Sequence, residues 1–65
     1  MRLHLNGQPQ EFPDSFTVAA LLTSLALTGR LAVEVNGDIV PRGKFPTHGL
    51  HDGDRVEIVR AIGGG

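Results

Sequence analysis

Alternating apolar and polar residues predict three β-strands in this chain. The alternation runs through residues 2–6, 31–36 and 54–61. Because successive side chains of a strand point to opposite faces of a sheet, each segment is expected to bury one face. The buried positions expected from this pattern are Leu3, Leu5, Leu31, Val33, Val35, Val56 and Ile58.

Two Asn-Gly pairs predict where the chain reverses direction. Asn6-Gly7 and Asn36-Gly37 are strong hairpin signals, because both positions of such a turn tolerate a positive φ. The first hairpin is expected to lead to a short strand at about residues 8–12. Pro9 places that strand at the edge of the sheet, since proline cannot donate to a ladder. The second hairpin is expected to lead to a short return strand through Ile39.

One amphipathic helix follows the first hairpin. Thr17 is a typical N-cap residue, whose hydroxyl accepts a hydrogen bond from an amide of the first turn. The next apolar residues recur at helical spacing and form one stripe, made of Val18, Leu21, Leu22 and Leu25. Gly29 is expected to end the helix.

These elements predict one fold class. The single helix has to cover one face of the sheet, because no other element can bury the apolar strand positions. We therefore expect an α+β protein with the β-grasp arrangement, a four- to five-stranded mixed sheet wrapped around one helix. Residues 1–62 would form this domain, and residues 63–65 a flexible C-terminal glycine tail. Residues 42–50 are expected to form an ordered loop, held by Phe45 and Leu50.

The composition of the 65-residue chain excludes several classes of function. There is no cysteine, so neither a disulfide framework nor a thiolate metal site supports the small core. A net charge of −1 does not supply the basic field that non-specific nucleic-acid binding requires. The N-terminal segment is too short and polar for a signal peptide, and no apolar run approaches the length of a membrane span. We expect a soluble, cytoplasmic protein with no nucleic-acid or membrane partner.

No set of residues predicts an enzyme active site or a metal centre. His48 and His51 lie three residues apart, but zinc sites need three or four ligands and no cysteine is present to complete one. Asp52-Gly53-Asp54 lacks the further carboxylates of a calcium loop and is expected to be a turn. No glycine-rich phosphate loop precedes a helix. The expectation is a protein that is not an enzyme and binds no metal or cofactor itself.

The sequence ends in three glycines directly after the last predicted strand. Glycine gives a core nothing to bury and is costly to order, so this tail adds little to stability. One interpretation is a frayed terminus. The other is an extended, unbranched segment that threads a narrow channel in a partner and presents the Gly65 carboxylate. A carboxylate becomes electrophilic only after adenylation with ATP, so a partner with a nucleotide site would have to activate it.

The last strand also offers an apolar spot beside the tail. Val59 and Ala61 are expected to face away from the core, whereas Ile62 has the parity of the buried positions. An exposed apolar patch can be a docking surface, although single exposed apolar residues are ordinary. Val59, Ile62 and Gly63 are the candidate partner-binding residues, Ile62 only if it lies outside the core.

Several stretches spread along the chain carry a family resemblance. They are the helix opening Thr17-Val18 with Leu21-Leu22, the hairpin Val35-Asn36-Gly37 to Val40-Pro41-Arg42, the aromatic Phe45, and residues 52–59 with the terminal Gly64-Gly65. Through them essentially the whole chain resembles the ThiS-type sulfur carriers of thiamine biosynthesis, a ubiquitin-like β-grasp family. The combination of Val-Pro-Arg, Asp-Gly-Asp and a terminal Gly-Gly makes this resemblance fairly specific.

The resemblance implies what the tail does. In such carriers an E1-like (ThiF-like) adenylyltransferase uses ATP to adenylate the terminal glycine. Sulfur from a donor such as a cysteine desulfurase then replaces AMP to give a thiocarboxylate, and a ThiG-like thiazole synthase takes that sulfur. On this chain the resemblance makes Gly65 the carrier residue, Gly64 its required neighbour and Gly63 a third glycine. The protein would then be a co-substrate rather than an enzyme.

Other β-grasp proteins remain as alternatives. One is a sulfur carrier of another pathway, such as the MoaD-like subunit of molybdopterin synthase. A second is a ubiquitin-like modifier, in which Gly65 would end in an isopeptide bond to a lysine. The product distinguishes these classes, because a carrier yields a free thiocarboxylate and a modifier yields conjugates. An RNA-binding β-grasp module would need a basic face and no free Gly-Gly end.

Overall fold

The structure is a computed structural model, and it describes residues 1–60. Five strands, one α-helix and one short 3₁₀-helix follow one another along this range. In chain order they are β1 (Arg2–Leu5), β2 (Gln8–Glu11), α1 (Val18–Ser24), β3 (Leu31–Val35), β4 (Asp38–Val40), η1 (Arg42–Lys44) and β5 (Arg55–Arg60).

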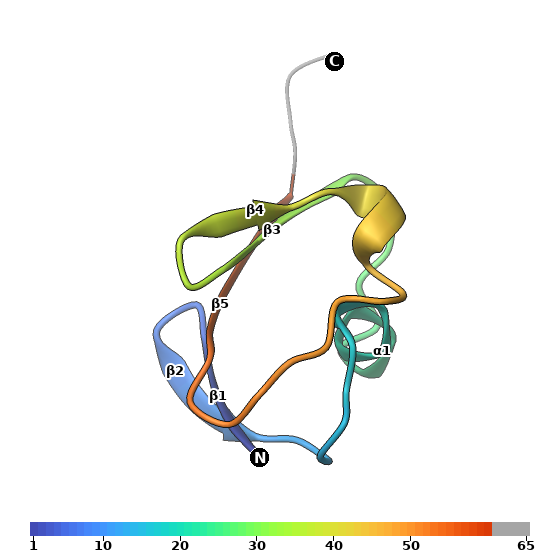
Figure 1. Ribbon diagram of the computed structural model, residues 1–65. Helices are drawn as coiled ribbons and strands as arrows, with labels where there is room; N and C mark the ends of the chain where they lie inside the picture. Colours follow the sequence, from blue (N-terminus) through green and yellow to red (C-terminus); the bar gives the residue numbers. More distant parts are fainter. Residues whose placement is uncertain (61–65) are drawn as a thin grey trace.

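The five strands form one mixed sheet in the order β2-β1-β5-β3-β4 (Figure 1). β5, the last strand of the chain, is the central one. It pairs parallel with β1 and antiparallel with β3, while the two hairpins supply the antiparallel outer pairs. The predicted β-grasp arrangement is confirmed, and β2 lies at an edge as expected from its proline.

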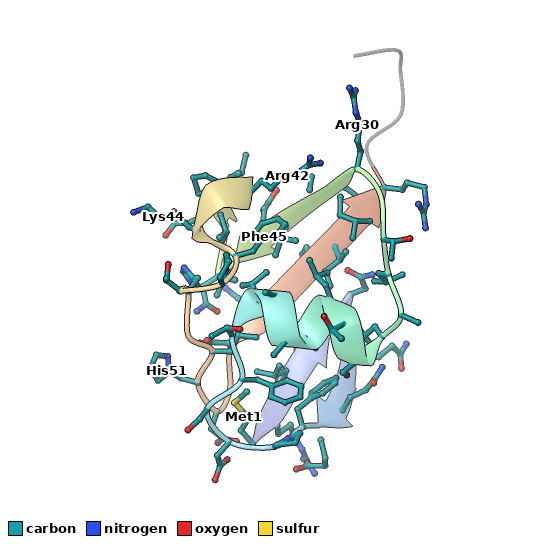
Figure 2. All side chains as sticks on the ribbon, turned by 90° about the vertical axis from the view of Figure 1, so that its right-hand side faces the viewer. Met1, Arg30, Arg42, Lys44, Phe45 and His51 are labelled. Carbon is teal, nitrogen blue, oxygen red and sulfur yellow. The ribbon has the colours of Figure 1, made fainter. Side chains whose placement is uncertain are left out.

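The core lies between α1 and one face of the sheet, and Figure 2 shows α1 lying across that face. Strand positions of one parity and the apolar stripe of the helix meet there. The side chains that are fully buried are Leu3, Leu21, Val18, Val33 and Val56. Burying each such side chain contributes roughly 1.5–3 kcal/mol. The two sequence periods, alternation in the strands and i, i+3, i+4 spacing in the helix, therefore identified the two halves of the core.

The start of α1 agrees with the prediction, but its end does not. Thr17 is the N-cap, and its Oγ1 accepts a hydrogen bond of 3.1 Å from the amide of Ala20. The helix ends at Ser24 rather than near Gly29, because Ala26 adopts a left-handed conformation (φ 57°). The amides of Ala26 and Leu27 then bond the carbonyls of Thr23 and Leu22, which is a Schellman cap. Glycine usually occupies the left-handed position of this cap, so an alanine there gave no signal.

The loop after η1 is ordered by contacts with the beginning of α1. The carbonyls of His48 and Phe45 accept hydrogen bonds from the amides of Val18 and Ala19, at 3.0 and 2.9 Å. These are among the first amides of a helix, which have no partner within the helix itself. Leu50 is buried and Phe45 packs against the core, as predicted. The loop therefore completes the helix as well as covering the core.

Candidate functional site

The end of β5 is the part of the described structure that leads to the predicted carrier residues. Val59 lies on β5 itself. Ile62, Gly63, Gly64 and Gly65 lie outside the described residues. The site can therefore be built up to Arg60, the last residue of β5. Figure 1 shows this end of β5 at the opposite end of the molecule from the N-terminus.

β5 is held unequally by its two neighbours. On one side the pairing with β3 continues to the end of the strand, where Leu31 lies opposite Arg60. On the other side the pairing with β1 ends early, with Leu5 opposite Val56. The last residues of β5 therefore have a strand on one side only.

The side chain of Asn6 takes the place of the missing strand. Its Oδ1 accepts a hydrogen bond of 2.8 Å from the amide of Ile58, and its Nδ2 donates one of 3.1 Å to the carbonyl of the same residue. Asn6 begins the first hairpin turn with φ 49°, and its own amide bonds the carbonyl of Val56 at 2.9 Å. One residue thus forms the turn and continues the ladder along β5.

Arg60 makes the last described contact of β5. Its Nη1 donates a hydrogen bond of 3.1 Å to the carbonyl of Thr28, in the connection between α1 and β3. Arg60 also borders a cavity of about 200 Å³ on the helix side of the sheet. The residues that line this cavity are Leu5, Asn6, Leu25, Leu27, Leu31, Ile58 and Arg60. The end of β5 from Ile58 to Arg60, called the exit of β5 below, is thus bordered mainly by leucines, together with the amide of Asn6 and the guanidinium of Arg60.

The solvent face of the sheet carries the exposed apolar residues. Val59 is 59% exposed and Ile39, on β4, is 73% exposed. The prediction that Val59 faces away from the core is therefore confirmed. On the same face Glu34 and Glu57 lie directly opposite each other across β3 and β5. Like charges placed directly opposite each other repel, so this pair is destabilising in the isolated domain.

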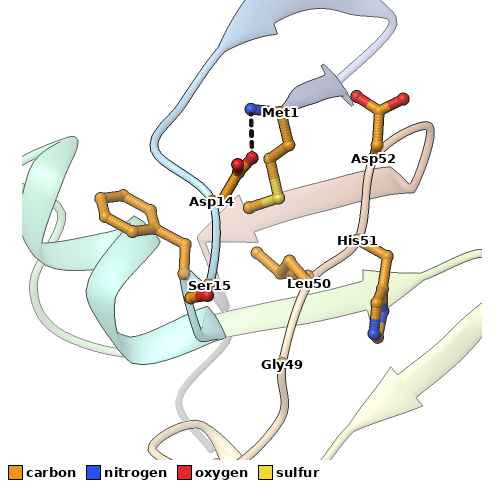
Figure 3. Close-up of a pocket in the computed structure, with 8 residues that line it drawn as sticks. Met1, Asp14, Ser15, Gly49, Leu50, His51 and Asp52 are labelled. Carbon is orange, nitrogen blue, oxygen red and sulfur yellow. Dashed lines mark hydrogen bonds and ion pairs between the residues drawn. The ribbon is translucent and has the colours of Figure 1, made fainter.

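A larger cavity, of about 440 Å³, lies at the opposite end of the molecule (Figure 3). It is lined by residues 14–16, residues 49–52 and Met1. The amino group of Met1 is 3.0 Å from Oδ1 of Asp14, and this hydrogen bond raises the pKa of the amino group above its ordinary value. The pKa of Arg2 is raised in the same way by its hydrogen bond of 2.8 Å to Glu11. These contacts join neighbouring segments, and they lie far from the exit of β5.

No three His, Asp or Glu side chains within residues 1–60 are grouped so that they could hold a metal ion. The Asp52-Gly53-Asp54 segment forms the predicted turn. Its carboxylates accept hydrogen bonds from backbone amides, Asp52 from the amide of Arg2 at 2.7 Å and Asp54 from the amide of His51 at 2.8 Å.

No helix in the described range is long and apolar enough to cross a membrane.

Sequence reasoning identified both Asn-Gly turns but missed what their asparagine side chains do. Asn36, with φ 52°, accepts a hydrogen bond of 2.9 Å from the amide of Arg55 and donates one of 2.9 Å to Asp54. Asn6 contacts Ile58, which is 52 positions away along the chain. The only available signal was the choice of asparagine where glycine or aspartate would also permit the turn.

Comparison with known proteins agrees with this geometry. The ThiS family model matches residues 3–65. A crystal structure of thiamine biosynthesis protein ThiS from Geobacter metallireducens superposes with a TM-score of 0.89 at 35% identity, covering all of both chains.

Two similar curated proteins are longer. Over 66 residues the chain is 46% identical to a thiazole synthase of Paramagnetospirillum magneticum and 38% identical to one of Magnetococcus marinus. The whole chain is covered in both cases, but it spans only 20% of the length of each of those proteins. The family match includes the β-grasp domain and the terminal glycines, and we conclude that the chain belongs to the ThiS family.

Proposed function

We propose that this protein is a sulfur carrier in thiamine biosynthesis and that its reactive group is the carboxylate of Gly65. The observation that carries the proposal is the family match, which runs through residue 65 and so includes the Gly-Gly end. The likeness to a ThiS crystal structure over the full length of both chains supports it. The central position of β5 adds a mechanical argument, because the strand that leads to the tail is anchored in the middle of the sheet.

The proposed chemistry takes place at the terminal carboxylate. A carboxylate oxygen of Gly65 attacks the α-phosphorus of ATP, and pyrophosphate leaves, giving an acyl adenylate. Sulfur then attacks the carbonyl carbon and AMP leaves. Free sulfide gives the thiocarboxylate directly, whereas the persulfide of a donor protein gives an acyl disulfide, whose S–S bond a thiol reductant cleaves to release the thiocarboxylate. Gly64 and Gly63 leave the approach to this carbonyl unobstructed, since glycine has no side chain. The absence of cysteine means that no internal thiol competes for the adenylate.

In this proposal the chain is a co-substrate and other proteins supply the catalysis. An E1-like, ThiF-like adenylyltransferase binds the ATP, so no cofactor is required on the carrier itself. A donor such as a cysteine desulfurase supplies the sulfur, and a ThiG-like thiazole synthase consumes it. The similarity of this chain to a segment of two thiazole synthases supports the last of these partners. We propose a cytoplasmic location, since the proposed reaction consumes ATP.

Val59 and Ile62, with Gly63, are the proposed contacts to these partners. For Val59 the support is its 59% exposure on β5, directly before the tail. A partner that covers Val59 also covers the facing pair Glu34 and Glu57, which would be stabilised by basic side chains. The proposed docking surface is therefore an aliphatic residue bordered by two carboxylates.

Intact-mass measurement tests the proposed function. The protein is incubated with ATP, the adenylyltransferase and a sulfur donor, and then with iodoacetamide. Thiocarboxylate formation adds about 16 Da, the same as oxidation of Met1, but only the thiocarboxylate is alkylated in this cysteine-free chain. Fragmentation should place the adduct at Gly65.

Each other outcome of this experiment has a definite meaning. An adduct at Gly65 that is consumed only by a molybdopterin synthase assigns the carrier to the MoaD-like class. A conjugate to a lysine identifies a ubiquitin-like modifier. The absence of any ATP-dependent product contradicts a carrier role.

A further inference from the structure

The edge of β5 that faces β1 changes character at Val56. Up to that residue the edge is paired with β1, and the backbone amide of Asn6 bonds the carbonyl of Val56. Beyond Val56, the side-chain amide of Asn6 is the last partner that residues 1–60 provide. A side-chain amide presents N–H donors and a carbonyl acceptor in one plane, so it can pair with both groups of a peptide. Bonding both the N–H and the C=O of Ile58, it continues the ladder for one further step.

This contact lies close to the start of the tail. Ile58 is followed by Val59 and Arg60, the last described residues before the carrier segment. The backbone groups of Val59 point toward β3, where Ala32 lies opposite. From the other side, the side-chain amide of Asn6 is what residues 1–60 provide to hold this part of β5.

We propose that Asn6 is a positioning residue for the carrier reaction, because its two hydrogen bonds to Ile58 fix the position and direction of the end of β5, from which the chain continues to the carrier residues. This inference rests on the proposed function. A tail that enters a narrow tunnel has to be ordered when it binds, and every additional residue that is loose beforehand adds to the entropic cost. By keeping Ile58 to Arg60 in the sheet, Asn6 limits that cost to the tail itself.

The chain contains its own matched control. Asn36 is also the first residue of an Asn-Gly turn, has nearly the same φ (52° against 49°), and also accepts a hydrogen bond from a β5 amide. It holds Arg55, at the beginning of β5, from the β3 side. A change at Asn36 therefore removes the same kind of contact from the end of β5 that lies away from the tail.

The test compares Asn6→Gly with Asn36→Gly. Glycine keeps the positive φ that each turn needs and deletes only the side-chain amide. Steady-state kinetics of adenylation, followed as pyrophosphate release by the adenylyltransferase, give KM for the carrier and kcat. We expect Asn6→Gly to raise KM about tenfold, which corresponds to the cost of ordering about one more residue, with kcat within about twofold of wild type. Asn36→Gly should leave both parameters at their wild-type values.

A second measurement is independent of catalysis. Amide hydrogen exchange of Val59 reports on fraying at the end of β5, because this amide pairs with β3 and not with Asn6. We expect its exchange to accelerate at least tenfold in Asn6→Gly relative to Asn36→Gly, measured under conditions where both variants are folded.

The outcomes separate this inference from the proposed function. If the wild-type chain is adenylated and Asn6→Gly has the wild-type KM, or if both variants change Val59 exchange and KM equally, the role of Asn6 is overturned. A fall in kcat in place of a rise in KM also overturns it. If the wild-type chain itself gives no adenylate, the proposed function fails first.

Discussion

The two ends of β5 are held by different kinds of contact. At the beginning, Asp54 accepts hydrogen bonds from the amide of His51 at 2.8 Å and from the side chain of Asn36 at 2.9 Å. Nearby, Asp52 accepts from the amide of Arg2. At the other end the side-chain contacts are the neutral amide of Asn6 and a hydrogen bond from Arg60 to the carbonyl of Thr28.

This difference separates stability from function along one strand. Carboxylates at the beginning of β5 tie together three segments that lie far apart in the sequence, and hydrogen bonds to charged groups are the stronger ones. The exit is lined mainly by leucines and has an exposed apolar residue on its outer face. Changes at the beginning should therefore affect folding, and changes at the exit should affect encounters with partners.

Deletion of Gly64 and Gly65 should have the largest effect on function. We expect complete loss of adenylation and sulfur transfer with no change in the free energy of unfolding, because every buried core residue of the described range lies between Leu3 and Ile58. Adenylation assays and thermal unfolding of the same preparation measure both quantities. A truncated chain that unfolds would show instead that the tail is structural.

Asp54→Ala should have the converse effect. The side chain is only 15% exposed and accepts two hydrogen bonds, so we expect a loss of about 2 kcal/mol in the free energy of unfolding. Adenylation per folded molecule should stay at the wild-type rate. Urea unfolding measures the first quantity, and Asp38→Ala, at an exposed position at the start of β4, is the control. Lost activity in a fully folded Asp54→Ala protein would contradict the division between the two ends.

Val59→Asp should weaken binding to the adenylyltransferase about tenfold, since it removes an apolar contact and places a charge that has to be desolvated where the partner covers an aliphatic side chain. Stability should not change, because Val59 is 59% exposed. Ile39→Asp is the matched control. Ile39 lies on the same face of the sheet but on β4, which β3 separates from β5. Calorimetric titration of the three proteins gives the dissociation constants. Equal losses for both variants would mean that the whole face, and not the spot beside the tail, meets the partner.

The features predictable from sequence were those encoded locally. Alternation, Asn-Gly turns and the Thr17 cap each involve a few neighbouring residues, and the structure confirms them. The exception is Leu31, which packs against the core but is only partly buried. The predicted end of the helix, near Gly29, was wrong because Ala26 adopts the left-handed conformation that glycine usually adopts at the end of a helix.

The contacts that position the candidate site were not predictable in this way. Asn6 and Ile58 are 52 positions apart, and only the assembled sheet brings them together. Val59 was predicted to be exposed because strand parity determines exposure, whereas parity says nothing about which side chain replaces a missing strand.

The smallest expected effect concerns the Met1 amino group, at the end of the molecule opposite the exit. Its hydrogen bond to Asp14 raises its pKa, so the folded chain holds this proton more tightly than the unfolded chain does. The resulting stabilisation is fully present below the ordinary pKa of about 8 and is lost as the pH rises through the raised value. As the pH rises above about 8, we expect the midpoint temperature of thermal unfolding of the wild type to decrease slightly. In Asp14→Asn this temperature should vary less with pH. The effect is small because the Asp14 side chain is 87% exposed, and added salt should reduce it further. An equal fall in both proteins would assign the pH dependence to other groups. Adenylation at pH 7 should be the same in both proteins, because this contact lies outside the part of the molecule that guides the tail.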